Sequence, residues 1–367
     1  MSITFFHTHV SDRARELALG VLESGWLSEG AMVKQFESDL AARLGLVNPV
    51  ALNSGTSALH LALAIAGVGP GDEVILPPQT FVATGLAILM QGATPVFADI
   101  DAATGNISPA SVRSHITERT KAIIPVHWAG YPCDLDEINQ IAADAGITVI
   151  EDAAHALGAR YRGLPIGAIS PFTAFSFQAI KHLTTGDGGA LCCREVEMAE
   201  TARVRRWFGI DRARSKPSIL GERVFDIEQV GYKYHMNDLA AAVGLGNLED
   251  FQARLCRRKY LGAQYRKALD KIPGLELLNL REDRAHAYWL FTVLVERRED
   301  FLRALSAEGI PGSVVHLRID RHSVFGGPRP DLTGQEDFDR RQVAIPVHEG
   351  LTDDDVDLVI RSIRKGW

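Results

Sequence analysis

The sequence has little cysteine, no long apolar run and no excess of basic charge. Its four cysteines are Cys133, Cys192, Cys193 and Cys256 among 367 residues. None of them forms a C-x-x-C pair, so neither a zinc site nor a disulfide framework is indicated. The adjacent Cys192 and Cys193 are typical of a buried strand in a protein from a reducing compartment.

Membrane and secretory signals are also missing. No run approaches the ~20 apolar residues that are needed to span a bilayer. The N-terminal segment becomes charged at Asp12 and lacks the apolar core of a signal peptide. We therefore expect a cytoplasmic protein with no membrane partner.

The charge balance excludes a further class of partners. Lys and Arg number 39 against 46 Asp and Glu, which gives a net charge of −7. Proteins whose main partner is a nucleic acid usually carry a basic surface instead. The sequence contains neither G-x-G-x-x-G nor G-x-x-x-x-G-K-[ST], so the fingerprints of dinucleotide and Walker-type phosphate binding are absent.

What is present, between residue 50 and about 195, is an alternation of short apolar β-rich runs with helix-like segments. The runs are continuous, as expected for strands buried on both faces. The alternation predicts a mostly parallel, doubly wound sheet, in which ligands bind beyond the carboxyl ends of the strands. The predicted strands are 73–77, 94–100, 121–127, 147–152, 172–177 and 189–193, and the predicted helices are 56–67, 82–92 and 135–146.

The length indicates two domains. A long helical segment over 236–272 is predicted to lead into a second one. Beyond it, a strand-like stretch at 287–296, a helix at 299–309 and a terminal helix from about Thr352 predict a smaller α+β domain. We expect a large domain with the N-terminal segment over 1–245, and the linking helix with the small C-terminal domain over 246–367.

Three features carry chemistry. The first is N-S-G-T-S, residues 53–57, where a strand turns through Gly55 into a helix. Free backbone N–H groups at a helix start, together with the Thr56 and Ser57 hydroxyls, form an anion site. An ordinary N-cap is the alternative interpretation, because Ser and Thr prefer that position for structural reasons.

The second feature is Asp152, which closes a buried strand at the ligand-binding edge, with His155 three residues later. A buried carboxylate needs a cationic partner. A metal held by His127, Asp152 and His155 is one candidate, although the helix-spaced H-E-x-x-H signature is missing. A cation in the ring of a cofactor is the other, and His155 could also be a satisfied core histidine.

The third feature is Lys181, which follows an apolar, aromatic run and precedes glycines at 186, 188 and 189. Such surroundings lower the pKa of an amine and leave room for a ligand, so that the lysine can act as a nucleophile. A snorkelling lysine at a strand end is the alternative.

Together, an anion cradle, a buried Asp and an amine in an apolar pocket form the set that pyridoxal 5′-phosphate (PLP) needs. Its phosphate requires the cradle and its aldehyde requires a lysine. Its ring nitrogen requires an Asp that keeps it protonated, because the pyridinium is the electron sink.

Several long motifs then show a resemblance to a known family. The chain resembles the sugar aminotransferases of the DegT/DnrJ/EryC1/StrS family, within the fold type I PLP enzymes that share the aspartate aminotransferase fold. The motifs, in the order of the family, are SGWLSEGAMVKQFESDLA near residue 24, ALNSGTSALHLALA, GVGPGDEVILPPQTFVAT, GATPVFADID, TKAIIPVHWAGYPCDLDEI, VIEDAAHALGARYRG, FSFQAIKHLTTGDGG and VGYKYHMNDLAAAVGL.

The resemblance implies a role for each matching residue. Lys181 corresponds to the lysine that forms the Schiff base and shuttles the proton, Asp152 to the partner of the pyridinium, and His155 to the residue packed against the ring. Phe81 corresponds to the aromatic residue on the other face of the ring. The phosphate-binding positions correspond to Gly55, Thr56 and Ser176, with Gln178 where relatives often have His or Asn.

The chain also departs from the family pattern. Relatives commonly have Asn-Tyr-Arg where this chain has Lys233, Tyr234 and His235. That Asn reaches the phosphate in the neighbouring subunit, so the resemblance implies a homodimer with shared active sites in which Lys233 serves as a point charge. Asp187 replaces a frequent Glu. The stretch 312–326, expected near the sugar, lacks the pattern of the best-known members.

The function implied is transfer of an amino group, from L-glutamate, to a keto group of a nucleotide-linked deoxysugar, in polysaccharide or O-antigen biosynthesis. Two alternatives remain. One is a nucleotide-sugar dehydratase of the same fold, in which a His replaces the lysine and against which Lys181 argues. The other is a PLP-fold regulator without catalysis.

Overall fold

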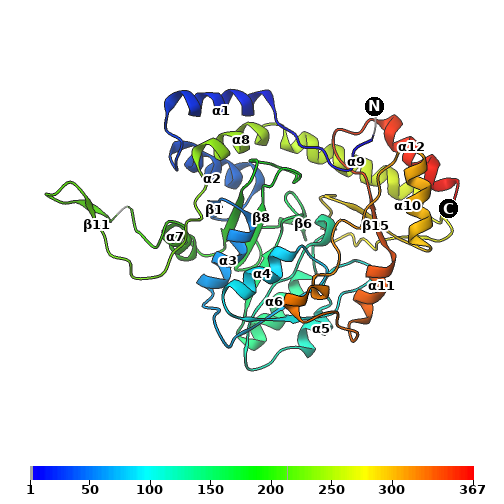
Figure 1. Ribbon diagram of the computed structural model, residues 1–367, viewed down its shortest axis with the longest axis horizontal. Coiled ribbons are helices and arrows are strands. Elements are labelled where there is room, and N and C mark those ends of the chain that lie inside the picture. Colours follow the sequence, from blue (N-terminus) through cyan, green and yellow to red (C-terminus); the bar gives the residue numbers. More distant parts are fainter. Residues whose placement is uncertain (1–2, 213) are drawn as a thin grey trace.

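The computed structural model describes residues 3–212 and 214–367 and is built around one seven-stranded sheet (Figure 1). The strand order is β1-β9-β8-β5-β4-β2-β3. Only β9 runs antiparallel to its neighbours in this sheet, so the prediction of a mostly parallel, doubly wound sheet is confirmed. The strands are β1 (Pro49–Leu52), β2 (Glu73–Leu76), β3 (Thr94–Phe97), β4 (Thr120–Ile123), β5 (Thr148–Asp152), β8 (Phe172–Ser176) and β9 (Gly189–Cys193).

Helices cover both faces of this sheet. Helices α3, α4 and α7 pack with one set of strand side chains, and α2, α6 and α8 pack with the other. Every residue of β1, β2 and β9 is buried, which explains their continuous apolar sequence. The covering helices are α2 (Ala31–Leu44), α3 (Gly55–Ile65), α4 (Val82–Met90), α6 (Leu135–Ala145), α7 (Val196–Arg205) and α8 (Asp238–Leu248).

The single helix predicted over 236–272 is wrong, because the structure has two helices there. Helix α8 ends at Leu248 and α9 spans Phe251–Leu269. The guanidinium of Arg254 donates to the Asn247 carbonyl at 2.6 Å and to the Asp250 carboxylate at 2.9 Å. Arg254 thus satisfies a carbonyl that the last turn of α8 leaves free, and the chain changes direction at this point.

Helix α1 (Asp12–Ser24) crosses over α8 at a glycine. A Cβ atom at Gly246 would collide with backbone atoms of Arg13 and Ala14. The absence of a side chain at Gly246 therefore sets how closely the two helices approach.

The C-terminal part contains a second, antiparallel sheet in the order β12-β14-β15. Its side chains share a core with α9, α10 and α12. The boundary between residues 245 and 246 stays a prediction. The elements are β12 (Leu275–Leu277), β14 (Phe291–Val295), β15 (Gln342–Ile345), α10 (Arg298–Ala307), α11 (Thr333–Arg341) and α12 (Asp353–Arg364).

A hairpin arm projects from the body after α7 (Figure 1). It contains β10 (Lys216–Pro217) and β11 (Arg223–Val224). Six large apolar side chains along it are exposed: Ile219, Leu220, Val224, Phe225, Ile227 and Val230. A monomer rarely presents such a row of apolar side chains to water unless another surface covers it.

Short elements complete the chain. They are α5 (Pro109–Ser114), a small sheet of β6 (Arg160–Tyr161), β7 (Leu164–Pro165) and β13 (Arg284–Ala285), and 3₁₀ turns at Trp128–Gly130, Ile319–Arg321 and Ser323–Phe325. Within residues 3–212 and 214–367, no helix has the length and apolar character needed to cross a membrane.

Candidate active site

A cavity of about 350 Å³, the sheet-edge cavity, opens beyond the carboxyl ends of β2, β5 and β8. Its location is the one expected for a ligand in a parallel sheet. Of the residues to which the family resemblance assigns a role, all except Lys233 line it: Gly55, Thr56, Phe81, Asp152, His155, Ser176, Gln178 and Lys181.

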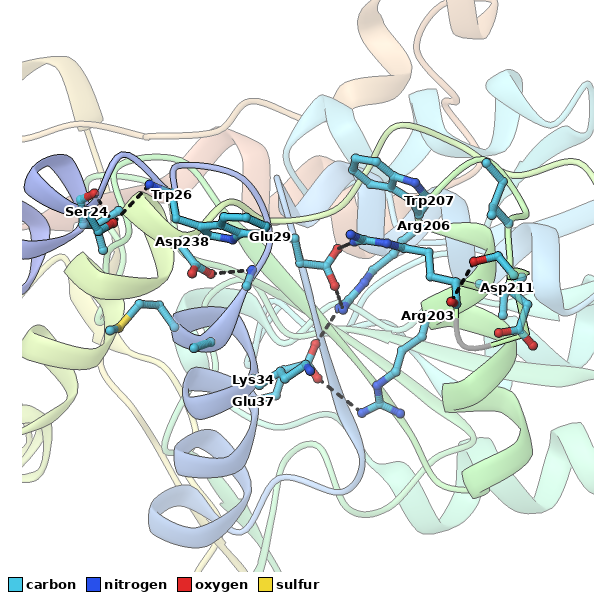
Figure 2. Close-up of a pocket in the computed structure, with 18 of the residues that line it drawn as sticks. Ser24, Trp26, Glu29, Lys34, Glu37, Arg203, Arg206, Trp207, Asp211 and Asp238 are labelled. Carbon is cyan, nitrogen blue, oxygen red and sulfur yellow. Dashed lines mark hydrogen bonds and ion pairs between the residues drawn. The ribbon is translucent and has the colours of Figure 1, made fainter. Parts of the chain in front are cut away.

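A larger groove of about 1,400 Å³, the arm groove, lies between α1, α2, α7 and the start of the hairpin arm. None of the predicted site residues lines it. Figure 2 shows Arg206 on its floor between two carboxylates, donating to Glu29 at 2.8 Å and to Glu37 at 2.5 Å. Lys181, Asp152 and the start of α3 line the sheet-edge cavity and not the arm groove, so we place the candidate active site in the smaller cavity.

Lys181 lies in the turn that follows β8, where its amine is held away from water. Burial lowers the pKa of Lys181 from 10.5 to about 7, and attraction to Asp152 limits the shift. The Nζ atom lies 3.7 Å from the centre of the Trp289 ring. A large fraction of these amines is therefore neutral near pH 7, as a nucleophile requires.

Asp152 is buried at the end of β5 with both carboxylate oxygens fixed. Oδ2 accepts a hydrogen bond from Thr84 Oγ1 at 2.7 Å, and Oδ1 accepts one from the Ala154 N–H at 3.1 Å. Both donors are neutral. Among the described residues, no cation lies within ion-pair distance of this carboxylate, so it can take a cationic group from a ligand in the cavity.

His155 is a buried, neutral ring on the wall of the sheet-edge cavity. Burial holds the pKa of His155 well below 6.5, and the charge of Lys181 lowers it further. One face stacks on Trp289 with ring centres 3.7 Å apart, and Nδ1 is buried without a partner in the described chain. Phe81, by contrast, is 54% exposed, so its ring is free to pack against a ligand.

The start of α3 forms the cradle, but not with all the predicted groups. Ser54 is the N-cap, and its side chain accepts from the Ser57 N–H at 3.0 Å. The Ser57 hydroxyl donates to Asn53 at 2.6 Å, so its predicted role in an anion site is wrong. Gly55 and Thr56 line the cavity, and Gly55 lies against β8, where a Cβ would sit 3.0 Å from Ser176 Cβ.

The polar residues at the mouth of the cradle are Ser176 and Gln178. Ser176 Oγ accepts from the Gln178 N–H at 3.4 Å, and Gln178 Oε1 accepts from the Ile180 N–H at 3.1 Å. Within residues 3–212 and 214–367, Lys181 is the only Lys or Arg that lines the cavity. A phosphate bound here would meet a helix N-terminus and hydroxyl groups, with no second cation from the same chain.

Lys233 lies outside the sheet-edge cavity of its own chain. Its Nζ is 3.9 Å from the centre of the Trp207 ring, and its backbone carbonyl accepts from Asn53 Nδ2 at 3.1 Å. Tyr234 and His235 continue beside β1. A Lys233 side chain at this exposed position is available to another molecule.

The metal alternative has no geometric support in the described residues. His127 Nδ1 accepts from the Cys133 N–H at 3.0 Å, so Nε2 carries the proton and donates to Glu151 at 2.8 Å. Both ring nitrogens are thus used in the core, away from Asp152. No group of three His, Cys, Asp or Glu in the described part of the chain is placed to hold a metal ion.

Sequence reasoning missed two aromatic rings of the site, Trp289 and His316. His316 Nε2 is buried without a partner in the described chain, and burial lowers the pKa of His316 to about 4. The preceding Val315 has φ of 60°, which is rare for a β-branched residue. The available signal was their location: Trp289 lies within the strand-like stretch 287–296, and His316 lies within the stretch 312–326 that was expected near the sugar.

Comparisons with known proteins show to which family the chain belongs. The family model of the "DegT/DnrJ/EryC1/StrS aminotransferase family" matches residues 9–364. The "Spore coat polysaccharide biosynthesis protein SpsC" of Bacillus subtilis (strain 168) is 41% identical, covering 94% of this chain and 91% of that protein.

Solved structures resemble the whole fold. The sugar aminotransferase CalS13 from Micromonospora echinospora has 36% identity and a TM-score of 0.95, with 100% of both chains covered. The putative sugar aminotransferase Spr1654 from Streptococcus pneumoniae, solved in a PLP-form, has 29% identity and a TM-score of 0.92, covering 100% of this chain and 98% of that one. These findings confirm the resemblance seen in the motifs: the chain belongs to the DegT/DnrJ/EryC1/StrS aminotransferase family.

Proposed function

We propose that this protein is a PLP-dependent aminotransferase that moves an amino group from L-glutamate to a keto group of a nucleotide-linked deoxysugar. The observation that carries the proposal is Lys181, an amine with a pKa of about 7 in a cavity that also holds Asp152 and the start of α3. Family membership and the sugar aminotransferases among the similar structures support the same activity.

The donor groups of the sheet-edge cavity fit PLP. The cofactor, when bound, supplies an aldehyde that carries the amino group and a ring that accepts electrons. The residues Gly55, Thr56 and Ser176 would hold the phosphate. Asp152, which has only neutral donors around it, would hold the ring nitrogen protonated.

The remaining roles follow from the chain's own side chains. His155 and Phe81 would bracket the ring, and the closed stack of His155 on Trp289 keeps water from that side. Lys181 would bond covalently to the cofactor at rest. Once released from it by substrate, its Nζ would accept and return the proton at the reacting carbon.

Among the described residues that line the sheet-edge cavity, Lys181 is the single Lys or Arg, and this supports a shared active site. We propose a homodimer in which the partner subunit's Lys233 approaches the phosphate. A second copy would also cover the exposed apolar side chains of the hairpin arm, which a monomer would leave in water. It could cover the arm groove as well, where Arg206 is already paired with Glu29 and Glu37 and needs no partner from the second chain. A cytoplasmic location and a role in polysaccharide or O-antigen biosynthesis stay predictions.

Two measurements test the activity. Purified protein with PLP should absorb visible light, and borohydride should fix the cofactor on a peptide that contains Lys181. A panel of nucleotide-linked keto-sugars with L-glutamate should then give an amino sugar and 2-oxoglutarate. Labelling of another lysine, or turnover by Lys181→Ala at a rate near the wild-type rate, would contradict the proposal. Loss of water from the sugar without nitrogen transfer would favour the dehydratase, and PLP binding without turnover would favour the regulator.

A further inference from the structure

Two threonine hydroxyls lead from the wall of the sheet-edge cavity to the Asp152 carboxylate. Thr84 Oγ1 lies 2.7 Å from Asp152 Oδ2, and Thr80 Oγ1 lies 2.7 Å from Thr84 Oγ1. Thr84 has no exposed surface and Thr80 is 1% exposed. Water therefore does not compete for these hydrogen bonds, and the low dielectric of the site strengthens them.

The direction of the chain of hydrogen bonds follows from counting protons. An ionised carboxylate can only accept, so the single hydroxyl proton of Thr84 goes to Asp152. Thr84 Oγ1 then accepts from the hydroxyl of Thr80. The competing acceptor for Thr84, the Phe81 carbonyl, is farther away at 3.2 Å. The chain therefore runs Thr80 to Thr84 to Asp152, and every step polarises the next.

The turn between β2 and α4 places this chain. Phe81 is the N-cap residue of α4, and Thr84 lies one turn later, facing β5. The same turn therefore sets Phe81 on the cavity wall and Thr84 against the Asp152 carboxylate. With the Ala154 N–H on Oδ1, both oxygens of Asp152 have a fixed donor.

We propose that Thr84, polarised by Thr80, is a positioning residue that keeps the Asp152 carboxylate ionised and oriented toward the ring nitrogen of PLP. The inference rests on the proposed function and deepens it. Thr84 acts through Asp152 and does not itself touch the reacting atoms. A structural hydroxyl that merely fills space would leave the electronic state of the bound cofactor unchanged.

The experiment compares holoenzymes by the pH at which the visible absorption band of bound PLP changes. In Thr84→Val, a methyl group replaces the hydroxyl that donates to Asp152. Asp152 then holds the proton that it shares with the PLP ring nitrogen more tightly, and the PLP ring carries less positive charge. The bond between Lys181 and the cofactor is then easier to protonate, and the midpoint should rise by about one pH unit, since a hydrogen bond to a charged group changes an equilibrium by roughly tenfold. Thr84→Ser should restore the wild-type midpoint.

A graded variant and a matched control complete the test. Thr80→Val should raise the pH midpoint by less than Thr84→Val does. It replaces Thr84→Val as the test if that variant does not fold. Thr292 is also a buried threonine, but its Oγ1 has no partner in the described chain, so Thr292→Val should leave the midpoint unchanged. Equal midpoints in wild type, Thr84→Val and Thr80→Val would overturn the inference while PLP binding stands. A wild-type protein that binds no PLP would overturn both.

Discussion

At Lys181, burial and charge act on one amine in opposite directions. Burial lowers the pKa from 10.5 to about 7, whereas Asp152 raises it. The family motif identifies the lysine, but it does not say how neutral the amine is. That property arises from the fold, which brings Trp289 and Asp152 next to a residue that is remote from both in the sequence.

The protonation of Lys181 gives a prediction for the protein stripped of cofactor. Only the neutral amine attacks an aldehyde, and the neutral fraction grows as pH rises through the pKa of the folded protein. The rate of covalent PLP capture should therefore rise with pH through about 7 and level off above it. Rapid-mixing absorbance measurements from about pH 5.5 to about pH 9 would show the midpoint, because this range extends about 1.5 to 2 pH units on each side of the expected pKa.

Asp152→Asn supplies the comparison for that measurement. The variant loses the negative charge that raises the pKa of Lys181, so the midpoint should move to lower pH. A wild-type midpoint near 10.5, or an upward move in Asp152→Asn, would show that burial does not control this amine.

The residues of the site were predictable to different degrees. Asp152 ends β5, while Phe81 and Lys181 follow β2 and β8, so the pattern of the sequence placed them at one edge of the sheet. Ser57 was misread because the cap depends on backbone geometry, and Ser54, with φ of −165° and ψ of 161°, is the residue that takes it. Trp289 and His316 come from distant segments, and although the stretch 312–326 was expected near the sugar, no local pattern singled out either ring.

At the scale of elements, apolar periodicity was a good guide to strands and a poorer one to helix ends. The strands at 73–77 and 189–193 were predictable because their runs are buried on both faces. The break between α8 and α9 was not, because no Gly or Pro marks it. It depends on Arg254, whose guanidinium binds the carbonyls of both His182 and Asn247.

The crossing of α1 and α8 gives a prediction in which packing opposes helix propensity. Propensity alone favours Ala over Gly inside a helix by about 1 kcal/mol. At Gly246 the added Cβ would collide with the α1 backbone, so Gly246→Ala should instead lower the free energy of unfolding by about 2 kcal/mol or more. Urea titration followed by circular dichroism would measure it.

Gly20, on α1, is the control for that substitution. A Cβ atom at Gly20 has no neighbour within 4 Å, so Gly20→Ala should be neutral or stabilising by up to about 1 kcal/mol. Similar changes in the free energy of unfolding at the two positions would mean that the close approach of α1 and α8 does not contribute to stability.

At the scale of the whole molecule, Lys233 is a phosphate-binding candidate that lies outside its own cavity. Lys233→Ala should weaken PLP retention by about tenfold, the size expected for a lost hydrogen bond to a charged group, without lowering the unfolding temperature. Lys233→Arg keeps the charge and should retain most of the affinity. Equilibrium dialysis at fixed protein concentration would measure both.

Mixed subunits test whether the active sites are shared. In a hybrid of Lys181→Ala and Lys233→Ala chains, one of the two sites keeps both lysines, so mixing two weak or inactive variants should restore part of the activity. A monomer by light scattering, or no recovery after mixing and refolding, would be evidence against the shared site.

The single lysine among the described residues that line the sheet-edge cavity has a consequence for how the protein behaves at low concentration. If a lysine that neutralises the phosphate comes from another polypeptide, as proposed for Lys233, then PLP binding and subunit association are thermodynamically coupled. Affinity for PLP then depends on protein concentration, and free PLP drives newly made chains into pairs. On this proposal, a chain would be completed as an enzyme only by pairing with its own copy, and unpaired chains would hold PLP weakly.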